Sequence, residues 1–412
     1  MEAHFPTAFF EGKKVHLGVC GSIAAYKALE LLRALCRANL RVTVTLTEAA
    51  ARFVSPLSFQ SLGAERVFTS MFAPAGAAPQ DSPLSSPFGH LAPGAEADAF
   101  VIAPASATTL ARLACGLADD LLAAQALAWS GSLLLAPAMN PRMWNNAATR
   151  ENCATLARRE HIILRPEQGR VACGEEGEGK LPDLRLIYLH CLKALSPGDL
   201  SGKKVMLTLG PTREPWDAVR FWSNHSSGRM GAALAVCAWL RGAEVYALCG
   251  PVAPWLPPRI NRLDVITAAD MLFQAEKLWP DMDMGIFTAA VADFAPEPFG
   301  DKKFKKSGQE AFSISFFPNP DILCKLGRVK KPGQLIVGFA AESERLEENA
   351  RHKLDSKNAD LMVANLIGVP GSGFSGTCNT ALILDRKGRR ESLPTMPKSD
   401  LAWRILDWLS TL

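Results

Sequence analysis

The sequence has no long uninterrupted hydrophobic run and no segment that resembles a secretory leader. No stretch of about eighteen apolar residues, the length that a membrane helix requires, is free of charge, Gly and Pro. The start, MEAHFPTAFFEGKK, lacks a basic segment followed by a long apolar one. These absences argue against export and against a membrane partner, and they predict a cytoplasmic protein.

Paired cysteines and a strongly basic surface are also lacking. The ten cysteines include no CxxC pair and no framework of close spacings, so we expect reduced thiols. The 45 basic and 41 acidic side chains leave a net charge of +4, and the basic residues are scattered apart from one cluster, Lys302–Lys306. This pattern is not the footprint of a nucleic-acid-binding protein.

What is present is ordinary for a globular chain. Hydrophobic residues make up 48% of the 412 residues and charged residues 21%, which is enough apolar surface for sizeable cores. At roughly 150 residues per domain, this length predicts two or three domains, and we expect two.

The order of predicted elements is typical of a parallel sheet. Apolar runs at 13–20, 41–47, 97–106 and 132–140 read as strands, and helical segments lie between them. The pattern fades into Pro, Gly and Ser before residue 202 and restarts with the strand KKVMLTLG. We therefore predict two doubly wound, Rossmann-like α/β domains, whose ligands lie beyond the carboxyl ends of the strands.

The segment GVCGSIAAYK places small residues between the first strand and a helix N-terminus, where backbone N–H groups favour a phosphate. The signal is weak by itself because the full GxGxxG spacing is absent. Five further segments strengthen it: VTLTEAAARFVSPLSF, FGHLAPGAEAD, PASATTLARLACGLADDLL, PAMNPRMW and GRVACGEEGEGKL. Together these segments resemble the flavin-dependent phosphopantothenoylcysteine decarboxylases, over about residues 12–185.

That resemblance implies a flavodoxin-like flavoprotein domain that binds FMN and decarboxylates a cysteine conjugate. Flavin oxidation at the thiol-bearing carbon supplies the electron sink that carboxylate loss needs. The resemblance implies that His90 acts as base or positioning group, that Asn140 holds the substrate carboxylate, and that Cys173, on a Gly-rich loop, donates a proton. The implied FMN-binding residues are Gly21, Ser22, Thr47, Ser106 and Thr109.

Two residues depart from the pattern of that family. Thr108 stands where many relatives carry Asn, and Lys180 stands where Arg is expected. The first departure bears on the flavin contacts. The second bears on how the loop holds substrate, because Lys cannot form the two-pronged contact of Arg.

The second half carries TLGPTREPWDAVRFWSNHSSGRMGAALA, then TAAVADF, KKFKK, FPNPDIL, VGFAAES and KNADLMVAN in that order. These segments resemble the phosphopantothenate–cysteine ligases over about residues 200–410. We therefore expect a linker at 186–202 and a ligase domain at 203–412. Here Trp216 replaces an aliphatic residue and Ala218 replaces Pro, which bears on loop stiffness or on a dimer contact.

The ligase resemblance implies activation of a carboxylate by CTP with Mg²⁺. In this step the negative charges of the carboxylate and the triphosphate must be stabilised by positive groups. Asn224 would hold the acyl-cytidylate, Arg220 would engage the acid or phosphate, and Lys303 would offset triphosphate charge. The implied metal contact is Asp293. The implied CTP-binding residues are Ala289, Ala290, Asp293, Lys303, Phe339, Lys353 and Lys357.

Both halves together resemble the bifunctional family of coenzyme A biosynthesis. That resemblance implies 4'-phosphopantothenate, cysteine and CTP as small-molecule substrates, and a homo-oligomer of decarboxylase trimers joined by ligase dimers. Two alternatives stay open. One is oxidative decarboxylation of a cysteine-ended peptide, and the other is a catalytically silent flavin-binding regulator. Retention of Cys173 argues against the first, and retention of both Cys173 and Asn140 argues against the second.

Overall fold

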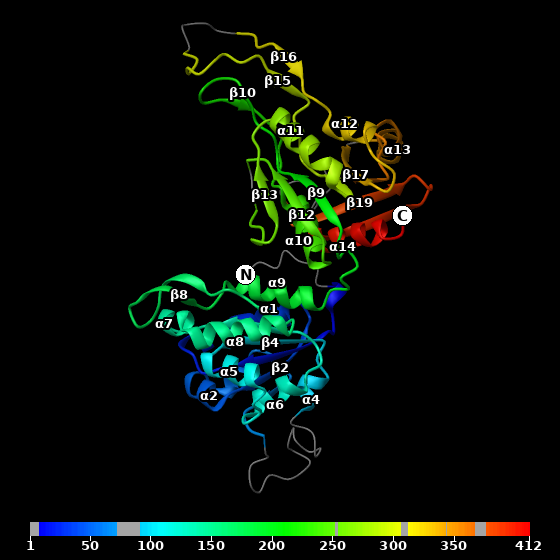
Figure 1. Ribbon diagram of the computed structural model, residues 1–412. Coiled ribbons are helices and arrows are strands. Elements are labelled where there is room, and N and C mark those ends of the chain that lie inside the picture. Colours follow the sequence, from blue (N-terminus) through cyan, green and yellow to red (C-terminus); the bar gives the residue numbers. More distant parts are fainter. Residues whose placement is uncertain (1–7, 72–90, 252–253, 306–311, 343, 367–375) are drawn as a thin grey trace. The chain divides into compact units, whose positions relative to one another are not determined.

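The computed structural model (Figure 1) describes residues 8–71, 91–251, 254–305, 312–342, 344–366 and 376–412. These residues form two compact units, one ending at Ser196 and the other beginning at Pro197. Each unit has its own sheet and its own hydrophobic core. We call them unit 1 and unit 2.

The sheet of unit 1 has six strands, all parallel, in the order β3-β2-β1-β4-β5-β6. In chain order the strands are β1 (Lys14–Val19), β2 (Arg41–Leu46), β3 (Arg66–Phe68), β4 (Ala99–Ala105), β5 (Leu133–Pro137) and β6 (Ile162–Ile163). The predicted doubly wound sheet is confirmed, and its order refines the flavodoxin-like expectation to the 3-2-1-4-5-6 order of dinucleotide-binding folds. The order reverses between β1 and β4, which marks the expected ligand site.

Helices cover both faces of this sheet, with α1 and α9 on one face and α5 and α6 on the other (Figure 1). A two-stranded antiparallel hairpin stands apart from the sheet. The helices are η1 (Ala8–Phe10), η2 (Ile23–Tyr26), α1 (Lys27–Arg37), α2 (Glu48–Phe53), α3 (Pro56–Ser61), α4 (Ala92–Ala95), α5 (Ala107–Cys115), α6 (Leu121–Ala128), α7 (Pro141–Asn145), α8 (Ala147–Arg158) and α9 (Leu184–Ala194), and the hairpin strands are β7 (Glu167–Arg170) and β8 (Glu176–Lys180).

Helix α9 shortens the linker predicted at 186–202. Its apolar residues Ile187, Leu189 and Leu192 are buried, and the helix packs against α1, β4 and β5. Burial of this apolar face makes the segment part of unit 1.

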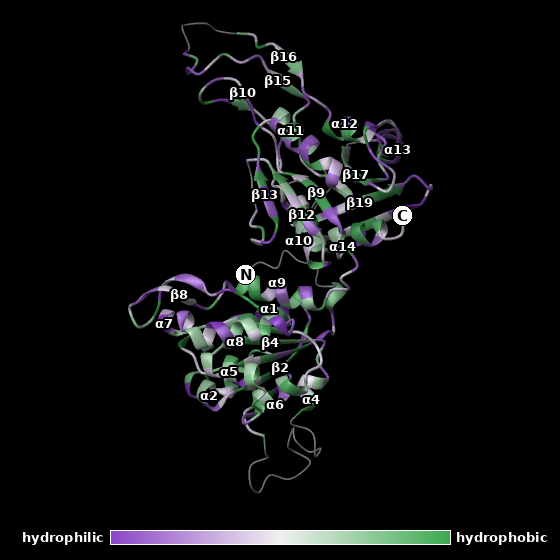
Figure 2. Cartoon of the chain, in the orientation of Figure 1, coloured by the Kyte–Doolittle hydropathy of each residue, from purple (hydrophilic) through white to green (hydrophobic). Residues whose placement is uncertain are grey.

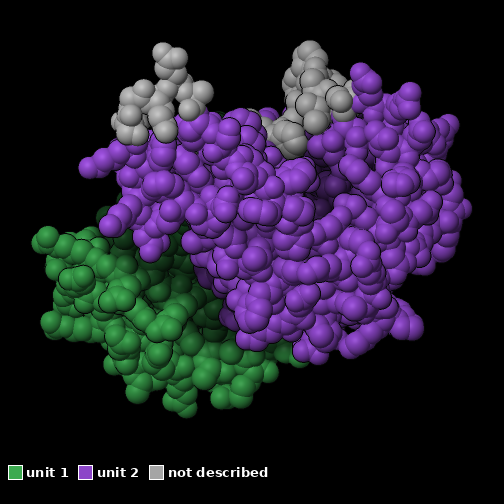
Figure 3. Space-filling view, turned by 90° about the horizontal axis from the view of Figure 1, so that it is seen from above, with its two compact units in different colours: residues 1–3, 7–196 green, residues 4–6, 197–412 purple. Residues whose placement is uncertain are grey.

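Unit 2 (purple in Figure 3) has an eight-stranded sheet in the order β13-β12-β9-β14-β17-β18-β19-β20. The first six are parallel, and β19 and β20, which the sequence analysis missed, are antiparallel. The strands are β9 (Lys204–Leu209), β12 (Glu244–Cys249), β13 (Asn261–Asp264), β14 (Met284–Phe287), β17 (Leu335–Glu342), β18 (Leu361–Leu366), β19 (Cys378–Asp385) and β20 (Arg390–Pro397). The order reverses between β9 and β14.

The helices of unit 2 differ sharply in polarity. Every residue from Met230 to Leu240 of α10 is buried, because this helix lies between the sheet and α14, whereas α13 is mostly hydrophilic (Figure 2). The helices are α10 (Arg229–Leu240), α11 (Ala268–Leu278), η3 (Trp279–Asp281), α12 (Ile322–Arg328), α13 (Leu346–Ser356) and α14 (Lys398–Leu409).

A small arm extends from the sheet of unit 2 and consists of two short antiparallel hairpins (Figure 1). Its strands are β10 (Glu214–Pro215), β11 (Phe221–Trp222), β15 (Phe294–Pro296) and β16 (Phe316–Pro318). At its centre the ring of Trp216 stacks on that of Phe312, with centroids 5.6 Å apart. This arm carries two of the residues predicted to act in ligation, Arg220 and Lys303.

Candidate active sites

The cavity of unit 1 lies where the fold predicts a ligand, at the carboxyl ends of β1, β2, β4 and β5. Its volume is about 1010 Å³, at the upper end of the range for cofactor and small-molecule sites. Five Ser and Thr side chains line it: Ser22, Thr47, Ser106, Thr108 and Thr109. It therefore contains all five residues predicted to bind FMN, since Gly21 also lies in its wall.

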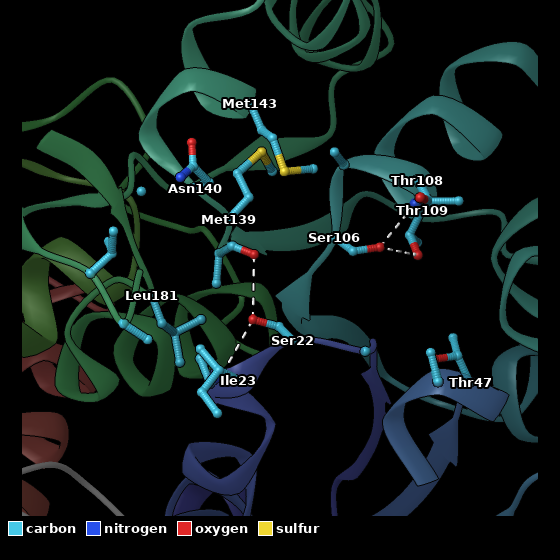
Figure 4. Close-up of a pocket in the computed structure, with 18 of the residues that line it drawn as sticks. Ser22, Ile23, Thr47, Ser106, Thr108, Thr109, Met139, Asn140, Met143 and Leu181 are labelled. Atoms are coloured by element: carbon cyan, nitrogen blue, oxygen red, sulfur yellow. Dashed lines mark hydrogen bonds between the residues drawn. The ribbon is translucent and has the colours of Figure 1, made fainter. Parts of the chain in front are cut away.

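The hydroxyls are held by helix caps, because each of three strands is followed within three residues by a Ser or Thr that begins a helix (Figure 4). Ser22 Oγ accepts from the Ala24 N–H at 3.3 Å, Thr47 Oγ1 from that of Ala50 at 3.2 Å, and Ser106 Oγ from that of Thr109 at 3.2 Å. Such caps fix the hydroxyls at helix N-termini. The cavity wall thus offers polar groups beside backbone N–H groups.

Asn140 and Cys173 meet at the edge of this cavity. Asn140 Nδ2 donates to Cys173 Sγ at 3.1 Å and lies 3.1 Å from Glu175 Oε2, while Asn140 Oδ1 accepts from the Arg142 N–H at 2.7 Å. Cys173 is exposed in the turn between β7 and β8. The structure therefore brings together two residues that are 33 positions apart and that the sequence assigns to one reaction.

The β7–β8 hairpin is fixed to the segment after β5 by close backbone contact. Met139 N–H donates to the Gly179 carbonyl at 2.9 Å, and a Cβ at position 179 would lie 2.3 Å from the Met139 carbonyl oxygen. Trp144 Nε1 also donates to Glu178 Oε2 at 3.2 Å. Only glycine at position 179 permits the backbone of the hairpin to lie this close to Met139. This glycine of the sequence GEGK is therefore required for packing of the hairpin, and not only for a turn.

Three further residues that the sequence analysis singled out in unit 1 are Thr108, Lys180 and His90. Thr108 and Lys180, the two departures from the family pattern, both line the cavity. His90 lies outside the described residues, so its role stays a prediction.

The cavity of unit 2 lies at the carboxyl ends of β9, β14, β17 and β18. Its volume is about 640 Å³, well within the range for small-molecule sites. Predicted residues in its wall are Asn224, Ala289, Ala290, Asp293, Phe339, Lys353 and Lys357. As in unit 1, the cavity lies where the strand order reverses, here between β9 and β14.

Asn224 is held against the loop after β14. Its Nδ2 donates to the Val291 carbonyl at 2.9 Å, and Asn319 Nδ2 donates to the next carbonyl, that of Ala292, at 2.8 Å. The Ala292 N–H in turn donates to Thr212 Oγ1 at 3.1 Å. These bonds join three separated segments of the sequence around one wall.

Two lysines bring positive charge to the wall of this cavity, Lys353 in helix α13 and Lys357 at the C-terminal end of that helix, and each is paired with a carboxylate. Lys353 Nζ lies 2.5 Å from Glu342 Oε1, and Lys357 Nζ lies 3.2 Å from Asp321 Oδ2. Glu342 and Asp321 are 13% and 49% exposed, so the carboxylate of the second pair is more open to solvent. An anionic ligand could exchange with such carboxylate partners.

Arg220 and Lys303 do not line this cavity in the part of the chain that the structure describes. Arg220 Nη1 lies 2.9 Å from Asp217 Oδ2, and its guanidinium lies 5.4 Å from the Trp216 ring centroid. Asp217 also accepts from the Phe304 N–H at 3.0 Å, next to exposed Lys303. Several bonds from backbone N–H groups and the Arg220 charge hold the pKa of Asp217 below its usual range despite its burial.

The polar residues of this cavity that sequence reasoning missed include Asn319, Asn365, Asn379 and Lys398. Asn319 and Asn365 had a usable signal, because both belong to segments already singled out: Asn319 lies within FPNPDIL, and Asn365 ends KNADLMVAN. Asn379 and Lys398 had none, since they belong to the unpredicted strand β19 and to the helix after β20.

Metal and membrane features are limited among the described residues. They contain no group of three or more His, Cys, Asp or Glu side chains able to hold a metal ion. None of their helices is long and apolar enough to cross a membrane. All ten cysteines are free, as the lack of paired spacing predicts.

Two doubly wound sheets, each with a polar cavity at its reversal of strand order, define a two-domain α/β protein whose cavities lie where this fold class places nucleotide-like ligands. Family models agree with this division: residues 9–195 match the flavoprotein model, and residues 200–412 match the C-terminal domain of the DNA/pantothenate metabolism flavoproteins.

Curated relatives extend over the whole chain. The coenzyme A biosynthesis bifunctional proteins CoaBC of Vibrio cholerae and Escherichia coli are 39% and 40% identical, over 96% and 97% of this chain and 97% of each relative. That of Bacillus subtilis is 38% identical over 97% of both chains. A crystal structure of the C-terminal domain of a CoaBC protein covers 52% of this chain and 97% of its own, with 36% identity and a TM-score of 0.45. The chain belongs to the family of coenzyme A biosynthesis bifunctional proteins, which confirms the predicted family.

Proposed function

We propose that this chain carries out two successive reactions of coenzyme A biosynthesis. Unit 2 joins cysteine to 4'-phosphopantothenate with CTP, and unit 1, with bound FMN, decarboxylates the 4'-phosphopantothenoylcysteine to 4'-phosphopantetheine. The observation that carries the proposal is the contact of Asn140 with Cys173 at the edge of a hydroxyl-lined cavity, in a chain whose family membership extends over both units.

The residues of unit 1 fit FMN. The cavity provides hydroxyl groups at helix N-termini, which suit a phosphate and a polyhydroxylated chain, and its sulfur-bearing wall of Met139 and Met143 suits an apolar ring (Figure 4). Ser22, Thr47, Ser106 and Thr109 would hold the polar part. When bound, FMN supplies the oxidation that makes loss of carbon dioxide possible.

Asn140 and Cys173 then have separate tasks. The Asn140 amide can donate to the substrate carboxylate without a charge that would trap it. Cys173 is proposed to donate its thiol proton to the substrate carbon in the last step, in which the thiol product forms. Asn140 donates no proton in this proposal. The exposed turn that carries Cys173 lets the group approach and leave the substrate.

Unit 2 activates a carboxylate, a reaction in which anionic groups must be brought together. Asn224 is proposed to hold the acyl-cytidylate, while Lys353 and Lys357 supply positive charge to CTP and Phe339 flanks its base. Mg²⁺ would come with the triphosphate, because magnesium usually keeps phosphate and water ligands and needs few from protein; Asp293 is the candidate.

Arg220 and Lys303 are proposed to act from the arm of unit 2. Their side chains are more than a third exposed. Asp217 connects the two segments, because it forms an ion pair with Arg220 and accepts a hydrogen bond from the backbone N–H of Phe304, next to Lys303. A homo-oligomer is proposed as well, because exposed Ile23, Tyr26 and Met143 leave apolar surface at the rim of the unit 1 cavity.

The test is mass spectrometry of products formed by the purified protein from 4'-phosphopantothenate, cysteine, CTP and Mg²⁺. 4'-Phosphopantetheine is the expected product. Phosphopantothenoylcysteine alone would contradict the unit 1 assignment, and no product with any triphosphate would contradict the unit 2 assignment. Oxidised product from a cysteine-ended peptide would instead favour the alternative decarboxylase.

A further inference from the structure

A carboxylate with no role in the proposed function lies beside Asn140 and Cys173. Glu175 belongs to the turn between β7 and β8 and does not line the unit 1 cavity that the described residues form. Its Oε2 accepts a hydrogen bond from Asn140 Nδ2 at 3.1 Å, and its Oε1 lies 3.1 Å from Arg142 Nη2. The Arg142 side chain is 84% exposed, so this ion pair contributes little to stability. The contact with Asn140 is therefore the one that needs an account.

Both ends of the Asn140 amide are engaged. Its nitrogen carries two hydrogens and lies 3.1 Å from Cys173 Sγ and 3.1 Å from Glu175 Oε2. Its oxygen accepts from the Arg142 N–H at 2.7 Å, at the start of α7. The amide can therefore turn over only by losing partners, so its nitrogen faces the hairpin and its oxygen faces the helix.

The two hairpin partners differ in how strictly they fix this orientation. An ionised carboxylate accepts hydrogen bonds and cannot donate one, so Glu175 can pair only with the amide nitrogen. A thiol can donate or accept, so Cys173 could bond to the amide oxygen through its own S–H. Of the two, Glu175 is therefore the partner that selects the nitrogen end of Asn140.

The orientation of this amide decides where the thiol proton can point. With the Asn140 nitrogen beside it, Cys173 Sγ is the acceptor, and its S–H is left for the cavity that Cys173 lines. With the amide turned over, the S–H would donate to Asn140 Oδ1 and be unavailable to a substrate. The same reversal would present an oxygen instead of an N–H to a substrate carboxylate, and the two would repel each other.

We propose that Glu175 is a positioning residue of the unit 1 reaction. By accepting from Asn140 Nδ2, it holds the amide nitrogen toward Cys173 and leaves the thiol proton available for transfer. Because Cys173 lines the cavity and Glu175 does not, an entering carboxylate takes the hydrogen now shared with the sulfur, and Glu175 keeps the other. The inference rests on the proposed decarboxylase function, in which the thiol proton passes to the substrate carbon and the thiolate regains a proton from water.

The experiment supplies phosphopantothenoylcysteine to the purified full-length holoprotein and measures the ratio of oxidised ene-thiol to 4'-phosphopantetheine by mass spectrometry. Glu175→Met removes the acceptor at similar side-chain length and is expected to raise this ratio about tenfold, the usual effect of losing a hydrogen bond to a charged group. The KM for phosphopantothenoylcysteine should rise as well, because a reversed amide repels the substrate carboxylate. Glu175→Gln keeps an accepting oxygen at the same reach, so its ratio should lie between those of the wild type and Glu175→Met.

Glu178 provides a matched control on the same hairpin. Its Oε2 accepts from Trp144 Nε1 at 3.2 Å and its Oε1 accepts from Arg165, so it too pairs with one neutral N–H group and one arginine. Glu178→Met therefore weakens docking of the hairpin without removing a partner of Asn140. It should lower the total rate of decarboxylation and leave the product ratio as in the wild type. An equal rise in the ratio in both variants would assign the effect to docking and overturn the proposal.

A second measurement, hydrogen exchange of peptides that cover residues 167–180, separates orientation of the amide from loss of local structure. It reads the hairpin directly and does not depend on activity. Glu175→Met should exchange no faster than Glu178→Met, because each variant loses one pair of docking contacts. Faster exchange in Glu175→Met would mean that Glu175 holds the turn itself, and the positioning role would be wrong.

Failure of this inference is distinguishable from failure of the proposed function. If the wild type converts phosphopantothenoylcysteine to 4'-phosphopantetheine but Glu175→Met keeps the wild-type ratio and KM, the positioning role fails and the function stands. If the wild type releases no carbon dioxide from phosphopantothenoylcysteine, the proposed function itself fails. Should Glu175→Met not fold, the product ratio and KM of Glu175→Gln decide, and wild-type values in that variant would overturn the proposal.

Discussion

The side-chain amide nitrogen of Asn140 lies 3.1 Å from the sulfur of Cys173 and joins the segment after β5 to the turn of the β7–β8 hairpin. Glu175, in the same turn, lies 3.1 Å from the same nitrogen. The hairpin is thus held where its cysteine can reach the cavity of unit 1. This arrangement gives the roles of the two residues a direct test.

Cys173→Ser should stop the last step in unit 1 and leave the earlier one. A serine hydroxyl is a much weaker acid than a thiol, so the proton needed at the substrate carbon is not delivered. We expect phosphopantetheine output to fall at least a hundredfold while a decarboxylated, oxidised ene-thiol accumulates, measured by mass spectrometry. Cys115→Ser is the control, since Cys115 is exposed but does not line the cavity. Normal output from Cys173→Ser would end the proton-donor assignment.

Gly179→Ala should uncouple the hairpin from the sheet. The added Cβ would lie 2.3 Å from the Met139 carbonyl oxygen, so the backbone must move and the bond from Met139 N–H to Gly179 lengthens. Decarboxylation of supplied phosphopantothenoylcysteine should drop at least tenfold, with ligation unchanged. Glu176→Ala, at an exposed position of the same strand, should keep both activities. Full decarboxylase activity in Gly179→Ala would show that the docking is dispensable.

Asn224→Asp should abolish ligation while sparing decarboxylation. The substitution removes the donor to the Val291 carbonyl and adds a negative charge where anionic substrates meet. Loss of one such polar contact typically costs about a hundredfold or more in rate. Asn261→Asp in β13, also exposed, makes the same change of charge away from the cavity and serves as control. Equal loss of both activities in Asn224→Asp would contradict separate sites.

His16 should make unit 1 sensitive to acid. This fully buried residue of β1 contacts Thr43 at 2.8 Å and Gln125 at 3.2 Å, and burial lowers its pKa to about 4, opposed by the Gln125 bond. Between that pKa and the unfolded value near 6.5, only the unfolded chain binds the proton, so stability is present at neutral pH and falls as the pH falls.

The loss should reach about 3 kcal/mol at pH 4. Hydrogen exchange of peptides that cover β1, compared at neutral and acidic pH, measures it locally. His16→Gln, which lacks the titrating ring, should show a flatter pH dependence. The same slope in both proteins would assign the effect to carboxylates elsewhere.

Arg241→Met should weaken unit 2. The Arg241 side chain is 3% exposed, pairs with Asp199 and Asp407, and lies 5.2 Å from the Trp403 ring centroid. Because both carboxylates keep access to water, the cost should be that of charged hydrogen bonds, about 1.5–3 kcal/mol. Ligase activity should be lost at a lower temperature than decarboxylase activity, and Arg241→Lys should fall between. Equal inactivation temperatures in variant and wild type would refute the estimate.

Local sequence determined the sheets and part of each site. Runs such as KKVHLGVC and KKVMLTLG are apolar on both sides of the strand, which only a covered parallel sheet accommodates. The polar residues Ser22, Ser106 and Asn140 come within three residues of the ends of β1, β4 and β5, and they had to lie at one edge of the unit 1 sheet because parallel strands share a direction. Their presence in one cavity followed from the alternation of strand and helix alone.

Tertiary structure decided what the linear pattern could not encode. Contact of Asn140 with Cys173 depends on where the hairpin docks, and the addition of β19 and β20 brings Asn379 and Lys398 to the unit 2 cavity. Helix α9 joined unit 1 because its apolar face found a partner there. The physical reason is the same in all three cases. The hydrophobic periodicity and composition of a segment indicate which of its faces is buried, but packing over the whole unit determines which distant segments come into contact.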